Sequence, residues 1–186
     1  MSEKSNESLF KKQKSTKSKI EDVINATLEG NALKNAQDFI LYLRENKMTP
    51  GWASTSSWKA NYKGKSVCYI RLPGAATIED GSWHLALFAQ YDGYLNELIA
   101  SESEEIKALV KNHIDKNLPC GGCMPGLDRM SVNKEFSNIC ACTCINIKNP
   151  DEYLCGFAKK LIALRRSAVT DGRVPKCDYV KPADRK

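Results

Sequence analysis

The sequence has no long hydrophobic run and is poor in histidine, with two among its 186 residues. A membrane-spanning helix needs about 20 consecutive apolar residues. No stretch of the chain approaches that length, so we expect neither an integral membrane protein nor a membrane partner. The lysines of residues 1–19 precede no apolar segment, so we also expect no secretory signal and a cytoplasmic location.

The sequence also lacks the common short motifs of enzymes. It contains no Gly-x-Ser-x-Gly, no His-Glu-x-x-His and no Gly-x-Gly-x-x-Gly. Gly64–Ser66 resembles the end of a phosphate-binding loop, but Lys59 stands where the first glycine of that loop belongs. We therefore predict no catalytic residue, and we interpret His84 as a structural histidine on a strand.

The net charge of +6 is concentrated at the two ends of the chain. Residues 1–19 carry a net +4 and residues 170–186 a net +2, so residues 20–169 are formally neutral. A folded nucleic-acid-binding domain carries its basic residues on the domain itself. We therefore predict a disordered basic arm over 1–19 and a flexible tail over 170–186. Nucleic-acid binding through the arm is an alternative that this charge distribution does not favour.

The region between these ends is predicted to form one α+β domain over residues 20–169. Apolar residues at helical spacing predict helices over about 20–29, 31–46, 101–114 and 149–164. Stretches rich in β-formers, bounded by turn residues, predict strands over 58–62, 66–72, 82–88 and 139–148. Helices and strands are segregated along the chain, which favours an antiparallel meander packed against helices. A cysteine-rich element over 118–148 interrupts this pattern.

Six of the eight cysteines lie between residues 120 and 155. Cys120-Gly-Gly-Cys123 places two thiols on a turn that glycine permits, and Cys140, Cys142 and Cys144 follow in a strand-like segment. This spacing resembles that of zinc ribbons, in which four thiolates surround one ion. A closed site of this kind is structural rather than catalytic.

The predicted cofactor is zinc, with an iron–sulfur cluster as the alternative. The predicted metal ligands are Cys120, Cys123, Cys140 and Cys142. The fourth position is the least defined, and Cys144 and His113 are possible substitutes for Cys142 there. Spacing does not distinguish zinc from an iron–sulfur cluster.

The Cys120–Cys123 pair also permits thiol–disulfide chemistry, so a thiol-dependent oxidoreductase is an alternative function. Such enzymes place the first thiol at the start of a helix, whereas Met124-Pro125-Gly126 is a poor helix start. Structural disulfides are not expected, because the cytoplasm keeps thiols reduced. The cysteine pattern therefore favours a metal–thiolate site.

The region of the predicted meander, residues 52–94, is rich in aromatic residues and contains all three tryptophans of the chain. Aromatic side chains with polar ends beside an arginine are typical of a site for a small molecule. The predicted ligand-binding residues are Trp58, Tyr69, Arg71 and Trp83. The alternative is that these rings pack between the sheet and the helices.

Two sets of residues resemble known bacterial proteins. The first set is Trp58, Tyr62–Ser66, Cys68–Ile70 and Trp83. It resembles a sheet motif of small uncharacterised proteins related to the GyrI-like and YdhG-like small-molecule-binding domains. The second set is Cys120–Gly126, Asn133–Cys140 and Asn149–Asp151. It resembles a cysteine-containing element of clostridial proteins of unknown function. Together the matches span about residues 50–165, and they imply a fold and a cysteine site rather than an activity.

Overall fold

The computed structural model describes Gln13 and residues 15–74, 78–79, 81–89, 93–116 and 144–174. The helices are α2 (Ile20–Thr27), α3 (Gly30–Glu45), α4 (Gly93–Ser101), α5 (Glu104–Lys116) and α6 (Glu152–Thr170). The strands are β1 (Gly51–Ser54), β2 (Ser57–Tyr62), β3 (Lys65–Arg71), β4 (His84–Phe88) and β5 (Cys144–Lys148). This confirms the predicted α+β class. Most of the predicted cysteine-rich element lies outside the described residues.

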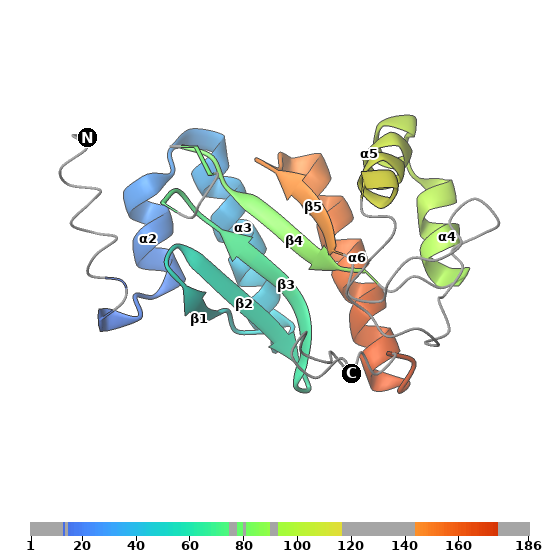
Figure 1. Ribbon diagram of the computed structural model, residues 1–186, viewed down its shortest axis with the longest axis horizontal. Coiled ribbons are helices and arrows are strands. Elements are labelled where there is room, and N and C mark those ends of the chain that lie inside the picture. Colours follow the sequence, from blue (N-terminus) through green and yellow to red (C-terminus); the bar gives the residue numbers. More distant parts are fainter. Residues whose placement is uncertain are drawn as a thin grey trace, which may run out of the picture. The chain divides into compact units, whose positions relative to one another are not determined.

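The five strands form one sheet in the order β1-β2-β3-β4-β5 (Figure 1). The pairs from β1 to β4 are antiparallel, which confirms the predicted meander. The β2–β3 hairpin turns at Lys63 and Gly64, which both have positive φ, as a two-residue type I′ turn requires. The backbone N–H of Asn149 donates to the carbonyl oxygen of Trp83 at 2.6 Å. This bond joins the end of β5 to the start of β4, so β5 is antiparallel to β4.

The two faces of the sheet differ in character. One face is apolar and buried, as shown by Trp58, Ile70 and Leu85, each at most 1% exposed. Helices α2 and α3 lie behind the sheet in Figure 1, and the ring of Phe39 on α3 contacts that of Trp83, with centroids 5.9 Å apart. The opposite face carries the half-buried or exposed polar side chains of Lys59, Tyr69, Arg71 and His84 together with the buried Ala86, and we call it the polar face.

Helix α3 is also tied to the first half of α6. The Tyr42 hydroxyl donates to the carbonyl oxygen of Lys159 at 3.0 Å, and the Asn35 amide donates to that of Pro150 at 3.3 Å. The residue numbers increase in the same direction along both helices, because Asn35 contacts Pro150 and the later Tyr42 contacts the later Lys159. The two helices are therefore parallel. Helix α6 begins after Asp151, whose carboxylate accepts a hydrogen bond from the Leu154 N–H and caps the helix.

The chain divides into two compact units, the first formed by residues 1–87 and 146–162 and the second by 88–145 and 163–186. The first unit contains α2, α3 and strands β1 to β3. The second contains α4 and α5, and α5 begins after Ser103, whose hydroxyl accepts a hydrogen bond from the Ile106 N–H. The single domain predicted over residues 20–169 includes parts of both units, and it stays a prediction.

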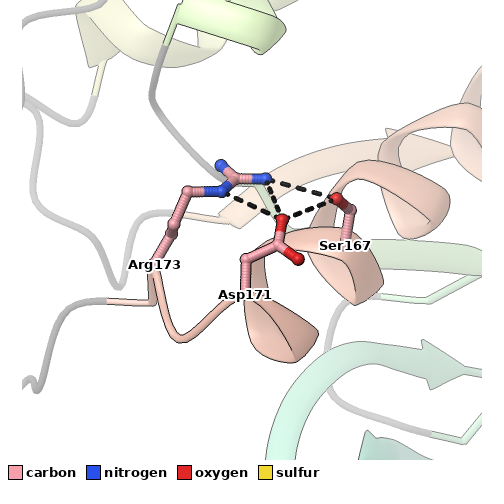
Figure 2. Close-up of polar contacts among 3 residues, drawn as sticks. All are labelled: Ser167, Asp171 and Arg173. Atoms are coloured by element: carbon pink, nitrogen blue, oxygen red, sulfur yellow. Dashed lines mark hydrogen bonds and ion pairs between the residues drawn. The ribbon is translucent and has the colours of Figure 1, made fainter.

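The C-terminal end of α6, in the second unit, is closed by a cluster of polar side chains (Figure 2). The Arg173 guanidinium contacts the Asp171 carboxylate at 3.1 Å and the Ser167 hydroxyl at 3.3 Å. The same guanidinium lies 4.8 Å from the ring centroid of Tyr94. Because these groups are partly exposed, we expect the ion pair to contribute at most about 1 kcal/mol. The predicted tail beyond residue 174 lies outside the described residues.

The N-terminal segment contacts the sheet through Gln13, which is fully buried. Its side-chain oxygen accepts a hydrogen bond from the backbone N–H of Ser56 at 2.7 Å. Ser56 lies in the turn between β1 and β2 at a φ of 53°. Further along, the Trp58 indole N–H donates to the Ser18 carbonyl oxygen at 3.1 Å. Of the predicted arm, Gln13 and residues 15–19 are therefore attached to the first unit, while residues 1–12 and 14 lie outside the described residues.

We expect Gln13→Ala to lower the free energy of unfolding by about 1–3 kcal/mol, because it leaves the buried Ser56 N–H without its acceptor. Urea titration followed by circular dichroism measures this change. Gln37→Ala is the matched control, since Gln37 is exposed and bonds only the exposed Asn25 side chain. An unchanged unfolding midpoint for Gln13→Ala would show that this attachment does not stabilise the fold.

Candidate functional site on the polar face of the sheet

The four predicted ligand-binding residues lie on two different faces of the sheet. Trp58 and Trp83 belong to the buried core, at 1% and 0% exposure. Tyr69 is half-buried and Arg71 exposed, both on the polar face. The structure therefore does not bring the tryptophans together with Tyr69 and Arg71, and the tryptophan rings pack between sheet and helices.

Arg71, His84 and Lys148 form a row across three neighbouring strands of the polar face, which we call the basic row. Arg71 on β3 is paired with His84 on β4. The Asn149–Trp83 hydrogen bond places the preceding residue of β5, Lys148, beside His84. Neighbouring strands lie about 4.8 Å apart, so three nitrogen-bearing side chains leave the sheet within a short distance.

The electrostatic field of the basic row acts on His84. Burial is the largest cause that lowers the pKa of this imidazole from its ordinary 6.5, and the charges of Lys148 and Arg71 add to it. Glu79, just before β4, opposes them. Within the described part of the chain, no carboxylate forms an ion pair with Arg71 or Lys148. Like charges on neighbouring strands repel, so an anion placed over the row would relieve that repulsion.

A second row runs beside the basic row and consists of Lys59, Tyr69 and Ala86. The Lys59 ammonium lies 5.6 Å from the centroid of the Tyr69 ring, a cation–π distance. Tyr69 stands two residues before Arg71 on β3, which puts both side chains on one face about 6.6 Å apart. Ala86 is the small member of this row and is buried, at 2% exposure.

The lowered pKa of His84 predicts a pH dependence of stability. Below pH 6.5 the unfolded chain binds a proton at this imidazole more readily than the folded chain. The His84 contribution is therefore fully present above about pH 6.5 and is lost as the pH falls through the lower folded pKa. We expect His84→Gln to weaken the fall in unfolding free energy between about pH 7.5 and pH 5.5, measured by urea titration. Identical pH profiles for the two proteins would contradict this assignment.

The predicted metal ligands, which are Cys120, Cys123, Cys140 and Cys142, lie outside the described residues. Of the two substitutes, Cys144 is the first residue of β5 and is partly exposed, whereas the side chain of His113 is outside the described part. No group of three or more potential metal ligands occurs among the residues that the structure describes. The zinc site therefore stays a prediction.

The buried cysteine of α6 is chemically distinct from that cluster. Burial raises the pKa of the Cys155 thiol to about 12, more than Lys159 lowers it, and Asp151 adds to the increase. The sulfur lies 3.9 Å from the Pro150 carbonyl oxygen. A thiol of this kind is neutral at physiological pH and a poor nucleophile, so Cys155 acts as a small core residue.

Arg165 is a buried charged residue that the sequence analysis did not single out. It lies on the part of α6 that belongs to the second unit and is 6% exposed. Burial lowers the pKa of its guanidinium, and Cys144 of the same unit opposes this shift. An arginine at the buried position of an amphipathic helix resembles its exposed neighbours in sequence, so its burial becomes visible only in the fold.

None of the described helices is both long and apolar enough to cross a lipid bilayer. The chain matches no family model, no curated protein and no solved structure. The resemblance to GyrI-like and YdhG-like domains therefore stays a prediction, and the function has to be inferred from the residues themselves.

Proposed function

We propose that this chain is a cytoplasmic small-molecule-binding module that takes an anionic ligand on the polar face of its sheet. The basic row carries the proposal. Arg71, His84 and Lys148 converge from three strands, and no described carboxylate pairs with the arginine or the lysine. The Tyr69–Arg71 part of the predicted ligand site is thus retained, with His84 and Lys148 in place of the tryptophans.

The three side chains differ in what they offer an anion. The planar guanidinium of Arg71 donates two parallel hydrogen bonds to a carboxylate or phosphate. The Lys148 ammonium adds a mobile point charge. His84 donates one ring N–H when neutral, and it gains a second N–H and a charge when a bound anion raises its pKa. A row of cations binds an anionic ligand and orients it, so the proposed role of the site is binding rather than catalysis.

Inorganic phosphate is the simplest probe of this proposal. We expect phosphate to shift the NMR signals of His84 and to raise its pKa in the full-length protein. Arg71→Gln with Lys148→Gln should weaken the affinity at least tenfold, since hydrogen bonds to charged groups are worth about 1.5–3 kcal/mol each. Lys34→Gln removes an exposed cation from α3 and should leave the affinity unchanged.

Two results would count against the proposal. One is that neither phosphate nor a carboxylate perturbs the His84 signals at millimolar concentration. The other is that Lys34→Gln weakens binding as much as the double variant, because the attraction would then follow from net charge rather than from the row.

We also propose that Cys120, Cys123, Cys140 and Cys142 hold a structural zinc ion. Their spacing supports this, because a glycine-containing Cys-x-x-Cys turn and a second group of cysteines are the usual elements of a four-thiolate site. The alternatives are an iron–sulfur cluster at the same cysteines and a thiol-dependent oxidoreductase. Metal analysis and cysteine alkylation distinguish both from a zinc site.

A further inference from the structure

We infer that the ligand of the basic row is an extended dianion, a small aliphatic dicarboxylate with one carboxylate bound by Arg71 and the other by Lys148. This inference rests on the proposed function, because it takes the basic row as the anion site. It adds the shape of the ligand and the number of its charges. Both follow from the exposure of the polar face and from the positions of the charges on it.

The exposed part of the polar face limits the shape of the ligand. Arg71 and Lys148 are exposed, and His84 is half-buried. The next residue of β4 on the same face is Ala86, which is buried at 2% exposure. A ligand on the basic row therefore does not extend along β4 toward Ala86. It lies across the strands instead, along the line from Arg71 to Lys148.

This line has a defined length and lies at one end of the sheet. Arg71 is the last residue of β3, His84 is the first of β4 and Lys148 is the last of β5. On β2 the residue paired with Arg71 is Ser57, which is only 7% exposed. The exposed line thus covers two strand spacings, or roughly 10 Å between the Cα atoms of Arg71 and Lys148. A chain with an anionic group at each end fits it better than one compact anion.

The charges along the row favour the same ligand. Arg71 and Lys148 carry its two permanent charges, one on each side of His84. None of the five described strands contains an aspartate or a glutamate, so no strand carboxylate neutralises them.

The middle of the row is less suited to an anion than its ends. The pKa of His84 is lowered, chiefly by burial, so the imidazole is mostly neutral at physiological pH and donates one ring N–H. Glu79 acts on the same imidazole, and its negative charge repels an anion placed there. Two carboxylates at the ends, joined by an uncharged chain over His84, therefore match the row.

Glutarate and its monomethyl ester are matched probes, because they share one carbon chain and differ by one charge. Malonate has both charges but a shorter chain, and inorganic phosphate is a compact anion. Each probe is titrated into the full-length protein by calorimetry. We expect glutarate to bind at least tenfold more tightly than its monoester, which loses one charge-assisted contact. We expect the same advantage over malonate, which is too short to reach both ends of the row.

Substitutions assign the two carboxylates to their partners. Lys148→Gln should weaken the affinity for glutarate about tenfold and leave that for the monoester nearly unchanged, because Arg71 holds a single carboxylate with two hydrogen bonds. Arg71→Gln should weaken both. Lys65→Gln is the matched control, since it removes an exposed cation from the other end of β3 and should leave glutarate binding unchanged.

The outcomes separate this inference from the proposed function. If no anionic probe binds, the proposed function fails and the inference fails with it. If phosphate binds but glutarate binds no more tightly than its monoester or than malonate, the extended dianion is excluded while anion binding stands. The inference is also overturned if Lys65→Gln weakens glutarate binding as much as Lys148→Gln does, because the attraction would then follow from net charge.

Discussion

Trp83→Ala is expected to lower the free energy of unfolding by about 3–5 kcal/mol, as truncation of a buried aromatic side chain commonly does. Trp83 is fully buried, and its ring contacts that of Phe39 on α3. Its removal opens a cavity between the sheet and this helix. Domains of ordinary stability have about 5–15 kcal/mol in total, so this substitution should remove a large share of the free energy of unfolding. Urea titration followed by far-ultraviolet circular dichroism measures the loss.

A second substitution of Trp83 separates the effect of lost side-chain volume from the effect of its polar indole N–H. The indole N–H of Trp83 is buried and has no hydrogen-bond acceptor among the described residues. Trp83→Phe removes this unsatisfied donor and keeps an aromatic ring, so we expect a cost below about 1.5 kcal/mol. If Trp83→Ala instead retained the native midpoint and lost phosphate binding, Trp83 would line a ligand site, as the sequence alone suggested.

Removal of the proposed zinc ion is the second change with a large expected effect. Structural zinc sites contribute about 10–16 kcal/mol of apparent binding free energy near neutral pH, which is coupled to folding of the metal-binding element. We therefore expect about one equivalent of zinc in the purified protein. A strong chelator should remove it with a loss of ordered structure. Elemental analysis and circular dichroism before and after chelation measure the two quantities.

Cysteine variants assign that metal to its ligands. Cys120→Ser with Cys123→Ser should abolish zinc retention, whereas Cys177→Ser, in the C-terminal tail, should leave it unchanged. Iron and a brown colour would assign the site to an iron–sulfur cluster. A metal-free protein whose Cys120 or Cys123 is alkylated rapidly near neutral pH would instead support the oxidoreductase.

The helices and strands were predictable from local pattern, but the division of Trp58 and Tyr69 between two faces was not. The turn at Lys63 and Gly64 pairs Tyr62 with Lys65. A regular ladder from that pair would place Trp58 opposite Tyr69, on one face. The register instead shifts by one residue after Ala60, so that Trp58 pairs with Ile70. A one-residue shift moves every following side chain to the opposite face of the sheet, and no residue type in the sequence predicts such a shift.

The basic row was only partly visible in the sequence. Arg71 was predicted to bind a ligand beside aromatic side chains, and His84 was interpreted as a structural histidine. Lys148 received no role, because its importance depends on the pairing of β5 with β4. Residues far apart in the chain become neighbours through such a pairing, which is set by the packing of the whole sheet rather than by local preference.

The discontinuity of the first unit has a consequence for biosynthesis. Its sheet lacks a last strand until residues 146–148 have been made, and α3 lacks its parallel partner until residue 162. A ribosome that adds roughly 5–20 residues per second takes several seconds to bridge this interval. During that time the outer edge of β4 has no neighbouring strand, which exposes unpaired backbone groups to other nascent chains. Slow translation across the segment that precedes β5 should therefore increase aggregation of this protein, and chaperones that shield strand edges should prevent it.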